Sequence, residues 1–450
     1  MSKTPLHIPE LRAQIARYVT VKDAITCVQV RKDWIEDFAY PIWHTIDFSC
    51  DIKLQYLDQD VFAKYGHHIR VVENLNEQWH LDVILWSQAS KLRHLATAMH
   101  NMVEFQAYCY EIIQRNIASL EHLDILSSVT PKLLMQINAL SPYPATKATS
   151  RLSILKLWGL YMTRNAFSRL LQQCPALDLL DIRQLVTHSR HTYETFQHPS
   201  LSILTASITQ VFNMCSNSHD AAPLLIHFPK LTSWKIRDTA PPAAVSMEAI
   251  KNGVNQYCPL LKTLYIETPS NTTRDLLSQA FTALTSVCFL YSTLSMEVIM
   301  AILSHQSSLK ELRAYAPSNT FYSSDEVPQL KAQFQGPSWV FQMLPRFCTQ
   351  LDTFTFPEHE MDIGEVENAN WGCMDLVVLC IRIRGLNTKE TIDRAIQLWV
   401  DGRTQSEESS GHNSTGLEND QSIAERVARH LLKFKKLRQV WLGRKVMSVE

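Results

Sequence analysis

The sequence predicts an α/β protein in which a small N-terminal three-helix domain precedes a repeat solenoid with a curved parallel sheet and outer helices. Three observations lead to this fold class. An apolar motif with the spacing of a short strand recurs along the chain. A second set of residues, cysteines and prolines, keeps a fixed distance from the start of the motif. The first 50 residues lack the motif and have helical spacing instead.

The recurring motif is best seen at Leu261-x-x-Leu264-x-Ile266. Its last two apolar residues are two apart, which is the spacing of side chains on one face of a strand. Full copies begin at Leu120, Leu152, Leu177, Leu231, Leu261, Leu284, Leu351, Leu376 and Leu437, and weaker copies begin at Leu92, Leu201 and Leu309. The pattern is that of about twelve leucine-rich repeats, which stack so that each unit buries its apolar face on its neighbours.

The second set of residues marks the corner between a helix and the strand that follows it. Four cysteines lie three residues before a first leucine: Cys174, Cys258, Cys348 and Cys373. Four prolines lie two residues before one: Pro175, Pro199, Pro229 and Pro259. Proline ends a helix and favours an extended chain, and cysteine is a small residue that is often buried. Apolar helical stripes follow several strands, for example Val298 to Leu303 after Ser295, a predicted N-cap.

Composition narrows the class of protein. The net charge of the 450-residue chain is −1, so no overall field favours nucleic acid as a partner. Ten cysteines form no C-x-x-C pair, which favours reduced thiols in the cytosol or nucleus. The sequence has no run of apolar residues long enough for a signal peptide or a membrane span. We therefore expect a cytoplasmic or nuclear protein with no membrane partner.

The N-terminal domain is predicted from residues 5 to 48. Leu11, Ile15, Tyr18 and Val19 have helical spacing, and breaks near 20–23 and 30–32 divide the segment into three short helices. A domain of about 45 residues buries too little apolar surface to be stable alone, so we expect a partner to cover the apolar surface that remains exposed.

This segment resembles the F-box family. The resemblance is carried by Ile8-Pro9-Glu10-Leu11, Ile15, Tyr18-Val19, Lys22-Asp23, Val28, Val30-Arg31-Lys32-Asp33-Trp34 and Trp43. The chain departs from the family pattern in two places, since Pro9 and Glu10 are adjacent and Val30, instead of cysteine, precedes Arg31. With the repeats that follow, the whole chain is similar to fungal-type F-box and leucine-rich-repeat proteins.

The resemblance implies a role in ubiquitin ligation. F-box proteins of this kind dock on the Skp-type adaptor of a cullin–RING (SCF) ligase and present a protein substrate on the repeats. The implied adaptor-binding residues are Ile8, Pro9, Leu11, Ile15, Ile25, Val28, Val30, Trp34 and Trp43. Among them, Ile15, Ile25 and Trp34 are expected in the core of the bundle, whereas Pro9 and Leu11 are expected to face the partner. The alternative is a non-ligase repeat scaffold with a degenerate F-box.

The substrate surface is predicted from strand geometry. Residues beside the buried pair of each motif point to the opposite, concave face of the sheet. They are His122, Asp124, Lys156, Asp181, Lys235, Tyr265, Glu311 and Arg313, a set of mixed sign that suits an unidentified protein partner.

The domain boundaries follow from these patterns. Residues 1–50 form the F-box-like domain, 51–90 a linker with an atypical first repeat strand near Ile69–Val72, and 91–450 the solenoid. Two longer steps between repeats contain insertions at about 317–345 and 402–421. The first is predicted to be a loop with Phe321, Tyr322 and Trp339 as exposed aromatics or as aromatics folded back on the solenoid. The second is polar and predicted to be disordered, between helices at 391–400 and 423–434.

No catalytic motif accompanies the repeats. The sequence contains no phosphate-binding glycine loop, no H-E-x-x-H and no G-x-S-x-G. For the close histidine pairs, His67-His68 and His188-x-x-His191, no nearby set of cysteines or carboxylates completes a metal site, so we predict no metal and no cofactor. We predict that the protein is not an enzyme.

Overall fold

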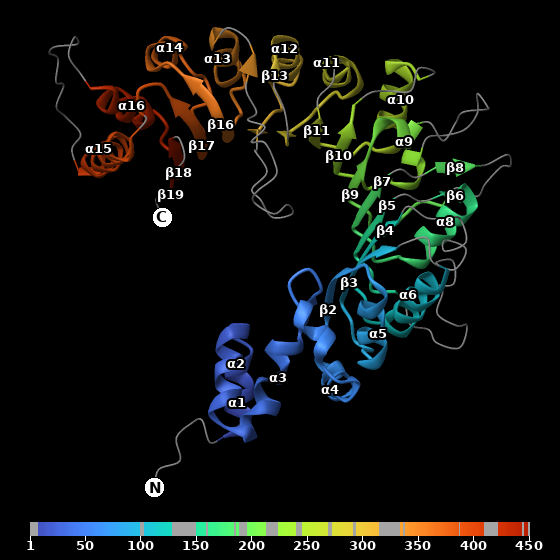
Figure 1. Cartoon of the computed structure of the whole chain (residues 1–450). Helices are drawn as coiled ribbons and strands as arrows, with labels where there is room; N and C mark the ends of the chain where they lie inside the picture. Colours follow the sequence, from blue (N-terminus) through green and yellow to red (C-terminus); the bar gives the residue numbers. More distant parts are fainter. Residues whose placement is uncertain are drawn as a thin grey trace. The chain divides into compact units, whose positions relative to one another are not determined.

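The computed structural model describes most of the chain (Figure 1). The described residues are 8–99, 103–127, 150–158, 161–183, 186–188, 196–212, 224–239, 245–268, 272–290, 294–314, 334–335, 338–386, 388–408, 422–442 and 445–448. The fold is α/β, with fifteen strands in one sheet order and helices along the sheet, as in a solenoid. The predicted fold class is confirmed at this level.

Three helices form the N-terminal bundle: α1 (Pro9–Ala16), α2 (Val21–Val30) and α3 (Ile35–Trp43), with a 3-10 turn at Lys32–Trp34. The first break covers residues 17–20, so that 21–23, predicted to be part of it, form the first turn of α2, whereas the second break falls at Arg31 as predicted. Thr20 caps α2 by accepting a hydrogen bond from the Asp23 N–H, 3.2 Å away. The buried core is small and consists of Ala16, Ala24 and Phe38, with Val28, Trp34 and other half-buried side chains packed against it.

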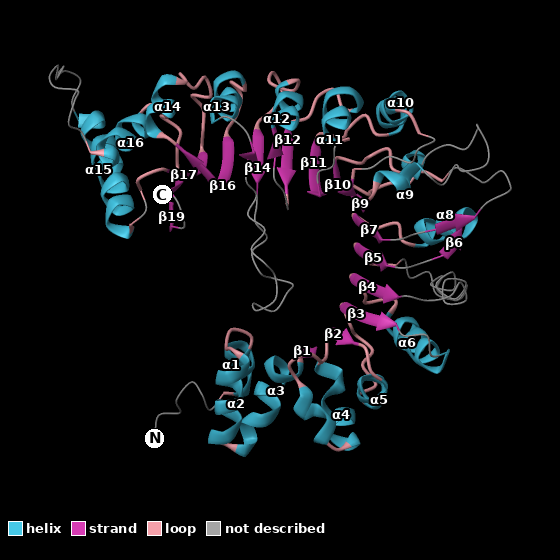
Figure 2. Ribbon diagram, turned by 45° about the horizontal axis from the view of Figure 1, so that its top comes forward, coloured by secondary structure: helices cyan, strands magenta, loops and turns pink. Residues whose placement is uncertain are grey.

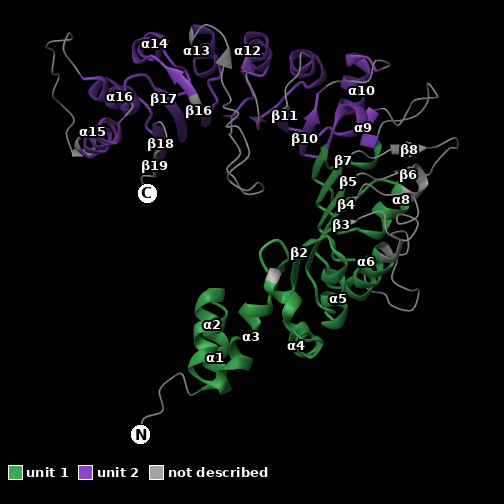
Figure 3. Ribbon diagram, viewed as in Figure 1, with its two compact units in different colours: residues 1–205, 226–230 green, residues 206–225, 231–450 purple. Residues whose placement is uncertain are grey.

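The chain divides into two compact units, residues 1–205 with 226–230 and residues 206–225 with 231–450 (Figure 3). Unit 1 holds the strands β1 (Thr45–Asp47), β2 (Val71–Leu75), β3 (His94–Met99), β4 (His122–Ser127), β5 (Ile154–Trp158), β7 (Leu179–Arg183) and most of β9 (Ile203–Ala206). Its other helices are α4 (Gln59–Tyr65), α5 (Gln78–Trp86), α6 (Val103–Asn116) and α8 (Arg164–Gln173). A separate pair is formed by β6 (Tyr161–Thr163) and β8 (Val186–His188).

Unit 2 holds the strands β10 (Ser233–Asp238), β11 (Thr263–Thr268), β12 (Ser286–Phe289), β14 (Glu311–Ala314), β16 (Thr353–Met361), β17 (Val378–Ile383), β18 (Gln439–Leu442) and β19 (Lys445–Ser448). Its helices are α9 (Ile208–Phe212), α10 (Met247–Tyr257), α11 (Thr273–Asp275), α12 (Met296–Leu303), α13 (Ser338–Phe347), α14 (Ile363–Asn368), α15 (Lys389–Glu408) and α16 (Ile423–Leu432). A short separate pair joins β13 (Leu294–Ser295) to β15 (Phe334–Gln335). The described strand pairs are parallel, except that β19 runs antiparallel to β18.

The repeat motif is the core of both units. In each unit the helices lie along one face of the sheet (Figures 1 and 2). The leucines that start the motif are buried against them, from Leu92 to Leu437, with Leu261 only half-buried. Ser295 caps α12 by accepting from the Val298 N–H at 3.4 Å, as the sequence predicts. The periodic leucines therefore fill the layer between helices and strands.

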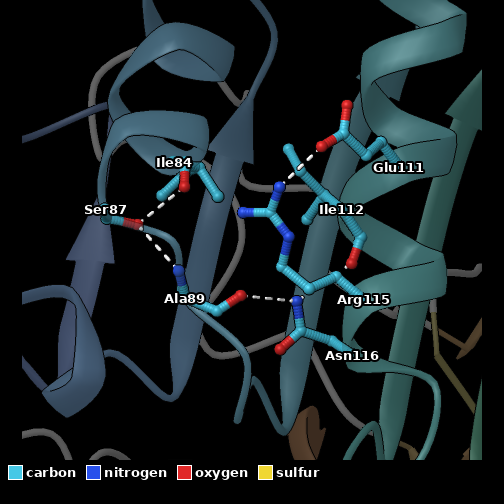
Figure 4. Close-up of polar contacts among 7 residues, drawn as sticks. All are labelled: Ile84, Ser87, Ala89, Glu111, Ile112, Arg115 and Asn116. Carbon is cyan, nitrogen blue, oxygen red and sulfur yellow. Dashed lines mark hydrogen bonds and ion pairs between the residues drawn. The ribbon is translucent and has the colours of Figure 1, made fainter. Parts of the chain in front are cut away.

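Polar side chains brace the corners between helix and strand. In Figure 4, Asn116 at the end of α6 donates through Nδ2 to the carbonyls of Ala89 and Ile112, each 2.9 Å away. Its Oδ1 accepts from the Leu92 N–H at 2.8 Å. His198 Nε2 makes a similar bond to the Cys174 carbonyl at 2.9 Å. These side chains satisfy backbone groups that the turns bury.

Several boundaries differ from the prediction. Strand β1 lies inside the segment assigned to the helical domain, and the first repeat strand is Val71–Leu75 instead of Ile69–Val72. Helix α13 covers 338–347, so the end of the first predicted loop is helical. Helix α15 runs to Glu408, which makes 402–408 helical where disorder was predicted. Phe321, Tyr322 and residues 409–421 lie outside the described residues.

Candidate functional site

An exposed apolar surface covers α1 and α2 of the bundle. It consists of Ile8, Leu11, Ile15, Val21, Ile25 and Val30, which are between 36 and 62% exposed. Ile8, Leu11 and Ile15 recur at steps of three and four, so they share one side of α1. Val21 and Ile25 repeat the arrangement on α2. We call these six residues the bundle surface. Pro9, at the start of α1, is exposed beside it.

Two of the predicted core residues belong to this surface. Ile15 is 39% and Ile25 is 43% exposed, so the expectation that they fill the core is wrong. The buried cluster takes the small side chains Ala16 of α1 and Ala24 of α2 together with Phe38 of α3, and Ile15 and Ile25 lie outside it. Trp34 and Val28 are half-buried and pack against the core. The guanidinium of Arg12 and the carboxylate of Asp37, 2.6 Å apart, tie α1 to α3.

Trp43 lies at the other end of the bundle. Its ring stacks on Tyr65, with centroids 5.4 Å apart and planes inclined by 11°, and meets the edge of Phe62 at 5.9 Å. Tyr65 and Phe62 belong to α4, the first helix after the bundle. Trp43 therefore joins the bundle to the first repeat instead of lying in the bundle surface.

In unit 1, four of the predicted substrate residues lie on the open face of the sheet, opposite the helices. Asp124, Lys156 and Asp181 occupy one register position on β4, β5 and β7. Lys156 Nζ is 3.4 Å from the Asp124 carboxylate. His122 stacks on His94 of β3 with ring centroids 4.0 Å apart. Burial lowers the pKa of His122 to about 3, so this ring is neutral near pH 7.

Sequence reasoning missed two side chains on the same face. Trp158 and Arg183 follow the motif on β5 and β7, and the Arg183 guanidinium lies 3.1 Å from the centre of the Trp158 ring. Arg183 is also 3.7 Å from Asp181. The strands β5 and β7 extend one residue beyond the six-residue motif, and that residue lies on the open face. The motif does not include this position, so it could not identify Trp158 or Arg183.

In unit 2, the other four predicted residues also lie on the open face. Lys235, Tyr265 and Arg313 share a register position, with Cys288 between the last two. Arg313 is 3.4 Å from Glu311, which accepts a hydrogen bond from Ser286 Oγ at 3.1 Å. Glu267, another side chain beyond the motif, is 4.0 Å from Lys235 and 3.7 Å from Arg237. A shallow polar cavity of about 200 Å³ is lined by Thr263, Tyr265, Thr285, Ser286, Lys310, Glu311 and Asp352.

Ionisable groups lie both on these surfaces and at the corners of the repeats. Ion pairs and neutral histidines cover the surfaces, and within the described ranges no three histidine, cysteine or carboxylate side chains gather as a metal site. Burial raises the pKa of Cys174 to about 11 and those of Cys258 and Cys348 to about 12, so these corner cysteines are thiols, not thiolates, near pH 7. His188 ends β8, and His191 lies outside the described residues.

Comparison with known proteins adds no assignment. No family model matches the chain, and no curated protein matches it significantly. Among the helices that the structure describes, none has the length and apolar character needed to cross a membrane. Two kinds of surface therefore bear on the function: the bundle surface and the open faces of the sheet.

Proposed function

We propose that this protein is the substrate-recognition subunit of an SCF-type cullin–RING E3 ubiquitin ligase. In this proposal the N-terminal bundle is an F-box that docks on a Skp-type adaptor, and the leucine-rich repeats bind a protein substrate on their open face. The protein then contributes proximity and orientation, while other subunits of the ligase carry out the chemistry.

The bundle surface is the observation that carries the proposal. The six apolar side chains of the bundle surface, on α1, on α2 and at the N-cap of α1, are each at least a third exposed, and a folded protein rarely leaves such a group of residues uncovered. The buried hydrophobic cluster of the bundle consists of Ala16, Ala24 and Phe38, and the bundle surface lies outside it. An adaptor groove that takes residues at steps of three and four fits Ile8, Leu11 and Ile15. Five of the six residues of the bundle surface, all except Val21, are among the adaptor-binding residues that the F-box resemblance implies, and the resemblance names the adaptor.

Co-purification of the full chain with a Skp-type adaptor tests the proposal. We expect the folded wild type to capture the adaptor and Leu11→Asp to lose it by roughly a hundredfold, since a buried unpaired carboxylate costs about 3 kcal/mol at an interface. Pro9→Ala is the milder probe, because Pro9 is exposed and its loss leaves the core of the bundle intact.

Met300→Asp is the matched control. Met300 is 49% exposed on α12 of unit 2, so the same change at a similar exposure should leave adaptor capture unchanged. A wild type that is folded by circular dichroism yet captures no adaptor would replace the proposal by the alternative, a repeat scaffold with a degenerate F-box. Equal losses in both Asp variants would point to unfolding.

A further inference from the structure

The open face of unit 1 carries a row of apolar and aromatic side chains that crosses six strands. The row consists of Val71, His94, His122, Ile154, Leu179 and Ile203, which are paired in register on β2, β3, β4, β5, β7 and β9. All six are half-buried. The two histidine rings stack with planes inclined by only 13° and, being neutral, continue the aliphatic part of the row. We call this set the apolar row.

The fold does not require apolar residues at this position. In unit 2 the same position is occupied by Ser233, Thr263, Ser286, Glu311, Thr353, Val378 and Gln439. Six of these seven side chains are polar, on strands that pair in the same parallel register. Since unit 2 forms its sheet with four hydroxyls, a carboxylate and an amide there, the apolar row of unit 1 is an added feature, typical of a surface that binds another molecule.

A charged row runs beside the apolar row. Asp124, Lys156 and Asp181 lie two residues further along β4, β5 and β7, on the same face of the sheet. A single lysine thus stands between two aspartates, and only 8% of the Asp181 side chain is exposed. Glu73 on β2 and its register partner Asp47 on β1 add two carboxylates, and Arg183 adds a second cation. With four anions against two cations, these strand positions carry a net charge of −2, which favours a basic partner.

We propose that the open face of unit 1 binds a segment of a partner protein in which aliphatic residues neighbour lysines or arginines. The aliphatic side chains would cover Ile154, Leu179 and Ile203, and the basic groups would meet the carboxylates of the charged row. Six strands about 4.8 Å apart span about 24 Å, the length of roughly seven extended residues. The inference rests on the proposed function in that this segment belongs to the protein that the ligase modifies.

The direct test is fluorescence anisotropy with the full chain and a labelled synthetic peptide of about twelve residues, enough to span the row, that alternates leucine and lysine. Two matched peptides replace every lysine by glutamate or every leucine by serine. We expect the leucine–lysine peptide to bind at least about tenfold more tightly than either, because each exchange removes one of the two contacts. Equal binding of the leucine–glutamate peptide, or no binding of any peptide, would overturn the proposal.

Variants locate the site. The double variant Ile154→Thr with Leu179→Ser gives unit 1 the residue types of unit 2, and we expect about tenfold weaker binding of the leucine–lysine peptide. Val378→Thr, at the same position in unit 2, is the control and should bind as the wild type does. Unchanged affinity in the double variant would refute the assignment. If the double variant fails to fold, Asp124→Asn decides, with an expected several-fold loss and a weaker dependence on salt.

The two proposals fail separately. Leu11→Asp should abolish adaptor capture and leave the peptide affinity unchanged, because the bundle surface and the apolar row share no residue. Peptide binding without adaptor capture by the wild type would remove the ligase role and keep the recognition surface. Adaptor capture without peptide binding would keep the ligase role and remove the recognition surface.

Discussion

At the scale of single residues, His430 is a buried titratable group enclosed by aromatic rings. Its ring is 4% exposed and lies between Trp371, edge-on at 5.1 Å, and Phe434 at 5.4 Å. Neither ring nitrogen has a hydrogen-bond partner in the described part of the chain. Burial, with a smaller contribution from Lys433, lowers the pKa of His430 to about 4. The ring is therefore neutral in the folded protein well below pH 6.

This predicts a loss of stability in acid. Between the ordinary histidine pKa and about 4, the unfolded chain binds a proton that the folded chain does not, so the free energy of unfolding falls as pH falls. The contribution of His430 is about 2 kcal/mol at pH 5. His430→Leu should therefore lose less of its melting temperature than the wild type between pH 7.5 and 5. His67→Leu, at an exposed histidine, should lose as much of its melting temperature as the wild type does. Equal losses of melting temperature in His430→Leu and the wild type would contradict the prediction.

At the scale of elements, the contact of α3 with α4 decides the role of Trp43. The stacked Trp43 and Tyr65 rings and the edge of Phe62 hold the two helices together. Trp43→Ala should remove about 1–3 kcal/mol of this packing and speed amide hydrogen exchange in α4, residues 59–65. Tyr18→Ala, at a 90% exposed ring, is the control and should leave α4 unchanged. Normal exchange in α4 together with lost adaptor capture would instead place Trp43 at the adaptor.

At the scale of the whole molecule, stability is expected to be local, because each repeat packs on its neighbours in a quasi-one-dimensional stack. Asn116→Ala should leave the Leu92 N–H and the Ala89 carbonyl unpaired and cost unit 1 roughly 2–4 kcal/mol. Exchange in β16, β17 and β18 of unit 2 should remain at the wild-type rate. Glu111→Ala, which removes only the exposed ion pair with Arg115 on the same helix, is the control. Uniformly faster exchange in both units would show that the chain unfolds as one body.

Local patterns predicted the strands better than the ends of the elements. Leu123, Leu155 and Leu180 are buried and their strands lie where the motif begins, since strand alternation needs only the sequence of the strand itself. Helix α13 was missed because its Pro345 and the polar residues before it indicate a loop, yet Val340, Phe341 and Leu344 bury one side of the helix. Strand β1 was missed because three residues carry no periodicity, and only the pairing with β2 makes them a strand.

The candidate sites, too, were predicted only in part from the sequence. The motif placed His122, Asp124 and Lys156 on the open face, but it had no means to show that His94 and His122 stack or that Ile154, Leu179 and Ile203 continue one row. In the bundle, the prediction that Ile15 and Ile25 fill the core was wrong, because helical spacing alone does not show which side of a short amphipathic helix faces the core.

By itself, the sequence determined the α/β class, the order of the repeats and which leucines lie between sheet and helices, because these depend on spacing along one segment. Only the tertiary structure decided which side chains become neighbours across strands and which apolar residues of α1 and α2 stay exposed. The reason is that register and helix approach are set by contacts between segments far apart in the chain. Those contacts, and not the motif, define the bundle surface and the apolar row.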